Sequence, residues 1–177
     1  MPLSKRGAFL SFKISTMKKN KFEFQYEVYD DISELQPADA SLLKTAREVA
    51  QGAYAPYSKF YVGAAARTEK GDIVTGTNQE NGSYPVGICA ERSLLSTAAT
   101  LFPGQAIDTM AVSYDNKRGE SKQPISPCGM CRQALQEYEI RGNKPMRMIL
   151  SGLEGEVIIV QSATQLLPFA FSGEELR

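Results

Sequence analysis

The hydrophobic pattern of the chain predicts β-strands separated by amphipathic helices. Residues 21–28 alternate apolar and polar side chains, which predicts an edge or N-terminal strand. Residues 40–52 repeat apolar side chains at spacings of three and four, which predicts a helix that ends at Gly52. Two shorter apolar runs, 60–66 and 73–78, flank the turn sequence EKGD and predict a β-hairpin.

The second half of the chain continues the alternation of strands and helices. The predicted elements are, in order, a helix over 89–102, a strand over 106–114, a helix over 128–140 that ends at Gly142, and strands over 146–152 and 156–161. Strands that alternate with helices indicate a layered α/β fold. The chain has 177 residues and neither an internal repeat nor a low-complexity linker, so we expect one domain over residues 23–177.

Charge is distributed unevenly along the chain and bears on the choice of substrate. The 20 Lys and Arg balance the 20 Asp and Glu, but residues 1–22 hold six basic residues and no acid. That leaves 14 basic against 20 acidic residues in 23–177, a net charge of −6. Because affinity for nucleic acid comes mainly from neutralising phosphates with Lys and Arg, we expect a small neutral substrate and no nucleic acid polymer.

The N-terminal segment and the cysteine count bear on location. We expect residues 1–22 to form a basic, disordered arm; a targeting segment is the alternative, and Met17 is an alternative start. No apolar run reaches the roughly 18 residues that cross a bilayer, so we expect no membrane partner. Three cysteines cannot all pair as disulfides, which favours a reducing, cytoplasmic location.

The three cysteines lie in two short motifs, each at the expected start of a helix. Cys128 and Cys131 form a CxxC pair, and Cys89 lies in the sequence ICAER. One explanation is a redox dithiol, because a helix N-terminus stabilises a thiolate. A second is that three thiolates bind one Zn²⁺ and leave its fourth tetrahedral position open, as in catalytic zinc sites. A third is that the cysteines are small buried side chains and Glu91 is a favourable first-turn acid.

Two neighbours of Cys89 favour the catalytic zinc site. Glu91 follows Cys89 by two residues and is well placed to shuttle protons for a zinc-activated water. Three thiolates and one Zn²⁺ leave a net charge of −1, which Arg92 and the two helix N-termini can compensate. The chain has no His and no fourth Cys that would close a structural site.

The motifs CAE at 89–91 and PCGMC at 127–131 resemble those of the zinc-dependent cytidine deaminase family. Further blocks resemble that family in the same order, namely YAPYSKFYVGAA (54–65), TGTNQENGSY (75–84) and LLPFAF (166–171). The resemblance covers roughly residues 40–172. It implies a three-layer α/β/α sandwich with a mixed central sheet, assembled as a homotetramer with sites at the subunit interfaces.

The resemblance also implies roles for single residues. Cys89, Cys128 and Cys131 would bind one Zn²⁺ per subunit, Glu91 would shuttle protons, and Arg92 would hydrogen-bond to the thiolates. The implied substrate contacts are Phe60, Asn78, Glu80, Ala90 and Phe171, the last reaching a neighbouring subunit's site. The implied reaction is hydrolytic deamination of cytidine and deoxycytidine with release of ammonia, in pyrimidine salvage. Pro85, Gly87 and Phe169 depart from the family pattern, which affects loop shape near the site.

The sequence alone does not exclude other functions. A deaminase of polynucleotide bases is disfavoured by the acidic body and by the lack of a basic stripe with interleaved aromatic residues. A zinc-containing binding or assembly protein without catalysis is disfavoured by the intact Glu91, and stoichiometric zinc would count against a redox dithiol. The sequence does not choose between cytidine, deoxycytidine and a related aminopyrimidine nucleoside.

Overall fold

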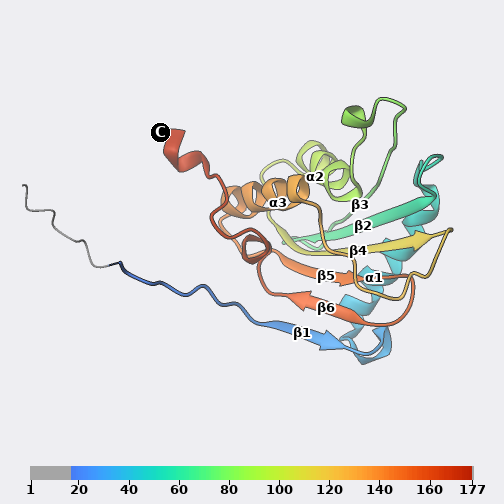
Figure 1. Cartoon of the computed structure of the whole chain (residues 1–177), viewed down its shortest axis with the longest axis horizontal. Coiled ribbons are helices and arrows are strands. Elements are labelled where there is room, and N and C mark those ends of the chain that lie inside the picture. The colour runs from blue at the N-terminus through green and yellow to red at the C-terminus, as the bar shows by residue number, and fades with distance from the viewer. Residues whose placement is uncertain (1–16, 177) are drawn as a thin grey trace, which may run out of the picture.

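A six-stranded mixed sheet forms the centre of the protein, in a computed structural model that describes residues 17–176 (Figure 1). The strands are β1 (Tyr26–Tyr29), β2 (Phe60–Thr68), β3 (Ile73–Thr77), β4 (Ile107–Asn116), β5 (Arg147–Ser151) and β6 (Val157–Val160). Their order is β1-β6-β5-β4-β2-β3. Only β4 and β5 run parallel to each other, and the other neighbours are antiparallel.

Helices cover both faces of the sheet. Helix α1 (Pro37–Val49) packs on one face, and α2 (Ala90–Leu101) and α3 (Gly129–Gly142) pack on the other. Side chains alternate along each strand between two apolar clusters, so Ala65 of β2 faces α1 while its neighbour Ala64 faces α2 and α3. The arrangement confirms the predicted three-layer α/β/α sandwich with a mixed central sheet.

The short elements and the helix ends refine the sequence prediction. The 3₁₀ helices span η1 (Ile32–Glu34), η2 (Ala50–Gly52), η3 (Tyr84–Val86), η4 (Ala163–Leu166) and η5 (Gly173–Leu176). Helix α1 begins at Pro37, earlier than predicted, because proline is well tolerated in the first turn, where its missing N–H is not needed. Helix α3 includes Gly142 as its last residue and is capped by Asn143, which takes the left-handed conformation with φ of 47°.

The predicted N-terminal edge strand over 21–28 is present in the structure but is shorter. Strand β1 spans Tyr26–Tyr29, and residues 17–25 form no regular element. The reason is that β6 offers only Val157–Val160 for pairing, so the alternation before Tyr26 has no neighbouring strand. Tyr29 packs against the α1 cluster, whereas the apolar side of the alternation is exposed.

The predicted basic arm lies mostly outside the described residues, because residues 1–16 are not among them. Residues 17–22 are exposed. Within the part of the chain that the structure describes, none of the helices is both long and apolar enough to cross a membrane.

Two glycines let helices approach the sheet closely. A Cβ on Gly63 of β2 would lie 2.1 Å from the carbonyl oxygen of Ala46 in α1. A Cβ on Gly76 of β3 would lie 2.5 Å from the backbone nitrogen of Leu94 and 2.6 Å from the carbonyl oxygen of Ala90, both in α2. Because real Cβ atoms do not approach so closely, these glycines set the depth at which α1 and α2 pack.

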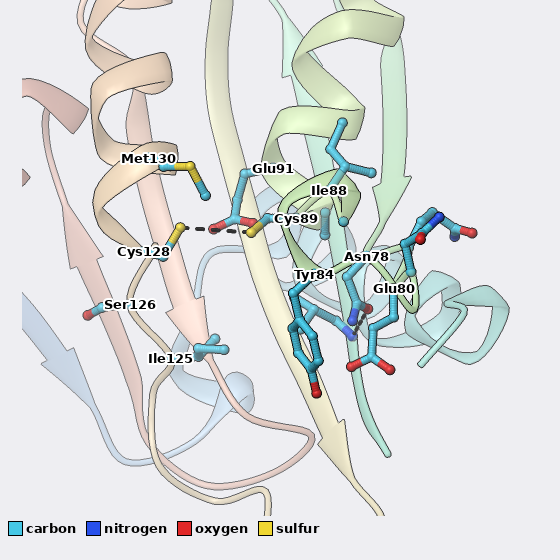
Figure 2. Close-up of a pocket in the computed structure, with 15 residues that line it drawn as sticks. Asn78, Glu80, Tyr84, Ile88, Cys89, Glu91, Ile125, Ser126, Cys128 and Met130 are labelled. Atoms are coloured by element: carbon cyan, nitrogen blue, oxygen red, sulfur yellow. Dashed lines mark hydrogen bonds between the residues drawn. The ribbon is translucent and has the colours of Figure 1, made fainter. Parts of the chain in front are cut away.

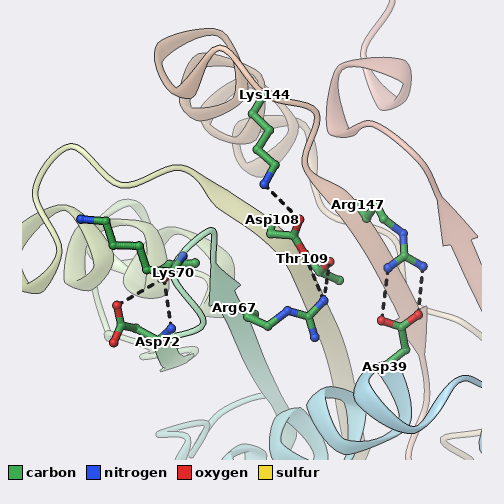
Figure 3. Close-up of polar contacts among 9 residues, drawn as sticks. Asp39, Arg67, Lys70, Asp72, Asp108, Thr109, Lys144 and Arg147 are labelled. Carbon is green, nitrogen blue, oxygen red and sulfur yellow. Dashed lines mark hydrogen bonds and ion pairs between the residues drawn. The ribbon is translucent and has the colours of Figure 1, made fainter.

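Ionic contacts stabilise the edge of the sheet where β2 ends and β4 and β5 begin (Figure 3). The Arg147 guanidinium of β5 donates two hydrogen bonds, of 3.2 and 2.9 Å, to the carboxylate of Asp39 in the first turn of α1. Asp108 of β4 pairs with Arg67 of β2 at 3.0 Å and with Lys144 at 3.3 Å. The first of these contacts joins α1 to β5. The contacts of Asp108 join β4 to β2 and to the segment that follows α3.

Candidate active site

Three thiol groups meet where α2 and α3 begin, and Figure 2 shows two of them, those of Cys89 and Cys128. Cys89 and Cys128 are the N-cap residues of α2 and α3, and Cys131 lies in the first turn of α3. The Sγ atoms of Cys89 and Cys128 are 3.8 Å apart, those of Cys128 and Cys131 are 3.4 Å apart, and all three lie within 4.8 Å of one another. The structure therefore brings together the three residues that the sequence proposed as zinc ligands.

The spacing of the sulfur atoms fits a tetrahedral zinc ion. Thiolates bound at about 2.3 Å in tetrahedral geometry lie about 3.8 Å from one another. The measured Sγ separations are close to this value, and all three cysteines are free rather than joined in disulfides. Both helix N-termini also favour negative charge at this point.

The thiols differ in exposure and in proton affinity. Cys131 is buried, Cys89 is half-buried and Cys128 is exposed. Hydrogen bonding with Cys131 lowers the pKa of Cys89 to about 6, against the opposing effects of burial and of Glu91. The same contact, together with burial, raises the pKa of Cys131. In the metal-free cluster, a proton thus stays on Cys131 while Cys89 ionises near neutral pH.

Glu91 is a buried carboxyl group beside the thiols. It lies in the first turn of α2, is 5% exposed and lines the same pocket as Cys89 and Cys128. Burial raises the pKa of Glu91, and hydrogen bonding to Cys131 and the charge of Arg92 only partly offset this effect. A carboxyl group with a raised pKa exchanges protons more readily near neutral pH, which suits a general acid and base.

A pocket of about 330 Å³ opens from this cluster, within the range of small-molecule sites. Its walls are formed by Val62, Asn78, Gln79, Glu80, Asn81, Tyr84, Gly87, Ile88, Cys89, Ala90, Glu91, Ile125, Ser126, Cys128 and Met130. Figure 2 shows the thiols of Cys89 and Cys128 with Glu91 at one end and the side chains of Asn78 and Glu80 at the other. The pocket can therefore hold a small molecule with its reacting group at the thiols.

Residues 37–143 match the family model described as the cytidine and deoxycytidylate deaminase zinc-binding region. The chain belongs to this deaminase family. The match covers α1 to α3 and includes the three cysteines and Glu91. It confirms the family that the CAE and PCGMC motifs predicted.

Several proteins named cytidine deaminase match this chain over most of their own length. The cytidine deaminase of Halalkalibacterium halodurans is 36% identical over 135 residues, which are 76% of this chain and 95% of that protein. The cytidine deaminase of Sporosarcina psychrophila is 38% identical over 136 residues, 76% of this chain and 92% of that protein. The crystal structure of cytidine deaminase from Burkholderia pseudomallei has a TM-score of 0.64 at 38% identity, covering 74% of this chain and 97% of that one.

Two polar residues at the far end of this deaminase's pocket are held by backbone groups. Asn78 accepts a hydrogen bond from the Val62 N–H at 2.7 Å and donates one to the Phe60 carbonyl at 3.0 Å. Glu80 accepts hydrogen bonds from the N–H groups of Tyr57 and Ser58. Although burial raises the pKa of Glu80, these hydrogen bonds lower it overall, so the carboxylate is charged.

Three of the predicted site residues lie apart from the pocket or lack the predicted contact. The ring of Phe60 stacks on Tyr114 with centroids 4.6 Å apart and does not line the pocket. Phe171 is 59% exposed, beyond the pocket of its own subunit. Within residues 17–176, Arg92 makes no hydrogen bond to a thiol, although its charge lowers the pKa of Cys89. Ala90, by contrast, is buried in the pocket wall. The roles of these residues remain predictions.

Sequence reasoning missed Arg132, which holds the loop before the metal ligands. Its Nε donates to the Pro127 carbonyl at 2.8 Å, and its Nη1 donates to the Leu166 carbonyl at 3.0 Å. The residue lies in the first turn of α3, where the helix dipole disfavours a cation. That unfavourable placement was the available signal that Arg132 has another task.

Proposed function

We propose that this chain catalyses the zinc-dependent hydrolytic deamination of cytidine to uridine, with release of ammonia. The observation that carries the proposal is the buried Glu91 beside three converging thiols, at one end of a pocket large enough for a small molecule. Deoxycytidine is a second proposed substrate, which would give the enzyme a role in pyrimidine salvage. The relatives that match this chain over nearly all of their own length are named for cytidine deamination.

The residues of the chain divide the chemistry between them. Cys89, Cys128 and Cys131 would hold the zinc ion, which when bound lowers the pKa of water and makes it a nucleophile at neutral pH. Glu91 accepts a proton from the attacking water and donates it to N3 of the pyrimidine while oxygen adds to C4. Glu91 then takes the remaining proton from the hydroxyl added at C4 and passes it to the exocyclic amine, so that the C4–N bond breaks, ammonia leaves and the C4 carbonyl of uridine forms.

The other end of the pocket would hold the sugar. Both hydrogen bonds that Glu80 accepts from the backbone use Oε2, so Oε1 is placed to accept one from a sugar hydroxyl. Asn78 uses one acceptor and one donor on the backbone of β2 and retains a second N–H for a hydroxyl oxygen. A carboxylate and an amide together can therefore orient the ribose, and with it the base.

The test is ammonia release from cytidine, deoxycytidine, cytosine and deoxycytidylate by the zinc-loaded protein. We expect release from the two nucleosides, and we expect Glu91→Gln to reduce turnover by at least ~10²-fold while keeping its zinc, because the amide cannot move the proton. Unchanged turnover in Glu91→Gln would remove Glu91 from the mechanism. Silence on all four substrates with zinc bound would refute the proposed activity.

Further proposals concern assembly and location. The resemblance supports a homotetramer in which Phe171 reaches a neighbouring site, and the exposure of Phe171 leaves it accessible for that contact. The free thiols support a reducing, cytoplasmic location. One catalytic domain over residues 23–177 also remains a proposal. Light scattering of the zinc-loaded protein tests the assembly, and a monomer that is fully active would contradict it.

A further inference from the structure

An exposed apolar row runs along β1 and the chain that precedes it. Phe22, Phe24, Tyr26 and Val28 are 54%, 39%, 56% and 50% exposed. The ring centroids of Phe22 and Phe24 are 6.3 Å apart, and those of Phe24 and Tyr26 are 6.2 Å apart. These spacings are close to the two-residue repeat of an extended chain, about 6.8 Å. The four side chains thus form one continuous row, which we call the β1 stripe.

The β1 stripe lies at an open edge of the sheet. Tyr26 is opposite Val160 and Val28 is opposite Ile158 in β6, and both partners belong to the apolar cluster on the α2 and α3 face. Among the described strands, β1 pairs only with β6 and ends the sheet. Figure 1 shows the chain before β1 extending away from the body. An apolar edge strand of this kind is a template for another strand, and proteins usually cover or charge such edges.

We propose that the β1 stripes of two copies of this chain pair edge to edge, as antiparallel strands related by a two-fold axis at Tyr26. In this register Tyr26 lies opposite Tyr26 of the second copy. Phe24 lies opposite Val28 of the second copy, and the reverse pair forms by symmetry. Directly opposed residues point to the same face, so the apolar side chains of both copies meet in one layer. Two-fold pairing is also the commonest symmetry for two identical chains.

Among registers centred on a residue of β1, charge selects this one. Pairing about Tyr26 places Lys21 of one copy opposite Asp31 of the other, twice by symmetry. Shifting the axis to Glu27 would oppose two carboxylates directly, which is unfavourable. Shifting it to Val28 would move Asp30 from a position opposite Phe22, before the strand, to one opposite Tyr26 within β1, and would lose the pairs between Lys21 and Asp31. Pairing about Phe24 would also oppose unlike charges, Lys21 with Glu27 and Lys18 with Asp30, but every opposed pair would then include a residue outside β1. Pairing about Tyr26 is therefore the complementary register whose axis lies within the strand.

The overall charge of the chain supports a second copy as the partner. Residues 1–22 hold six basic residues and no acid, whereas residues 23–177 carry a net charge of −6. Antiparallel pairing directs Lys18 and Lys19 of one copy along the acidic body of the other. Short paired edges bury less than the roughly 1,200 Å² of stable complexes, so this association is weak and depends on concentration. A covalent trap is therefore the suitable assay.

The experiment uses disulfide trapping in the full-length, zinc-loaded protein, whose native thiols are then occupied. Opposed residues in antiparallel strands have Cα atoms about 4.5–5.5 Å apart, within the reach of a disulfide. Tyr26→Cys should therefore give a covalent dimer on mild oxidation. Val28→Cys is the matched control, because Val28 is on the same face and is similarly exposed. Its two copies would be separated by about 14 Å along the strands and should stay uncoupled.

A double variant tests the register itself. Phe24→Cys combined with Val28→Cys should restore the dimer, with peptide mapping locating the bond between positions 24 and 28 of different copies. Deamination by the variants should equal that of the unmodified chain, since these residues lie outside the pocket. A failure of Tyr26→Cys to couple in active protein would overturn the pairing. Coupling of Val28→Cys alone, at the level of Tyr26→Cys, would overturn the register.

Discussion

A methyl group added at Gly76 should damage both stability and catalysis, because this glycine sets the position of α2. In Gly76→Ala the new Cβ would lie 2.5 Å from the Leu94 nitrogen, 2.6 Å from the Ala90 carbonyl oxygen and 2.8 Å from the Leu94 Cβ. Non-bonded carbon atoms in contact lie about 3.5–4.0 Å apart. Helix α2 must therefore move away from β3 by about 1 Å, and it carries Cys89 and Glu91 at its first turn.

Gly76→Ala should lower the stability of the fold, the turnover and the zinc affinity. Overpacking of this kind costs roughly 1–3 kcal/mol in the free energy of unfolding. For a chain of this size each kcal/mol lowers Tm by about 2–4 °C, so we expect a fall of roughly 2–12 °C. A displacement of about 1 Å at a reacting group can reduce turnover by about 10²-fold. Zinc affinity should fall too, because Cys89 moves relative to Cys128 and Cys131.

The assays are scanning calorimetry, bound zinc per chain, and kcat/KM for cytidine. Gly52→Ala is the matched control, since a Cβ there meets no atom within 4 Å and the backbone φ is ordinary. It should leave Tm and turnover close to those of the unmodified protein. If Gly76→Ala behaved like Gly52→Ala in all three measurements, the close approach of α2 to β3 would not position the site, and the reasoning would be wrong.

Three further outcomes test other contacts. Asp39→Asn should lower the free energy of unfolding in urea by roughly 1–3 kcal/mol, because it removes the ionic partner of Arg147, whose side chain is 29% exposed and partly screened. An unchanged urea midpoint would show that the ion pair does not contribute to stability. Arg132→Lys should weaken zinc binding about 10-fold or more in a chelator competition assay, because lysine cannot hydrogen-bond to the carbonyls of Pro127 and Leu166 at once. An unaltered zinc affinity would contradict this role. In the metal-free protein, Cys89 should alkylate with an apparent pKa of about 6, its thiolate fraction rising as pH increases through that value; a midpoint near 9 would contradict the coupling with Cys131.

The metal cluster and its family could be predicted because the chemistry is concentrated in few residues. The chain has three cysteines and no histidine, so a zinc site could use only these thiols and carboxylates. Their expected positions at helix starts needed only local pattern, and the structure places Cys89 and Cys128 as helix N-caps. The convergence of the two helix starts followed from the family resemblance and not from spacing. The residues of the metal cluster could therefore be predicted from the sequence itself, whereas their convergence in space could not.

The contacts that sequence reasoning missed depend on backbone groups from distant segments. Asn78 is bound to the backbone on both sides of its amide, and Arg132 holds carbonyls 5 and 34 residues away along the chain. Any residue supplies a carbonyl, so no side-chain pattern marks these partners. The same limit explains Phe60, whose stacking on Tyr114 depends on the register between β2 and β4.

The β1 region shows how a pattern can predict an edge strand correctly and still overstate its length. Alternation over 21–28 specifies which side chains share a side, and the row from Phe22 to Val28 does share one. Alternation does not specify what covers that side, because this depends on the length of the neighbouring strand. Since β6 pairs with only four residues of β1, the remaining alternation extends beyond the sheet. An apolar pattern without an internal partner is what an intermolecular strand pairing would require, and for this reason the disulfide test bears on the sequence as well as on the structure.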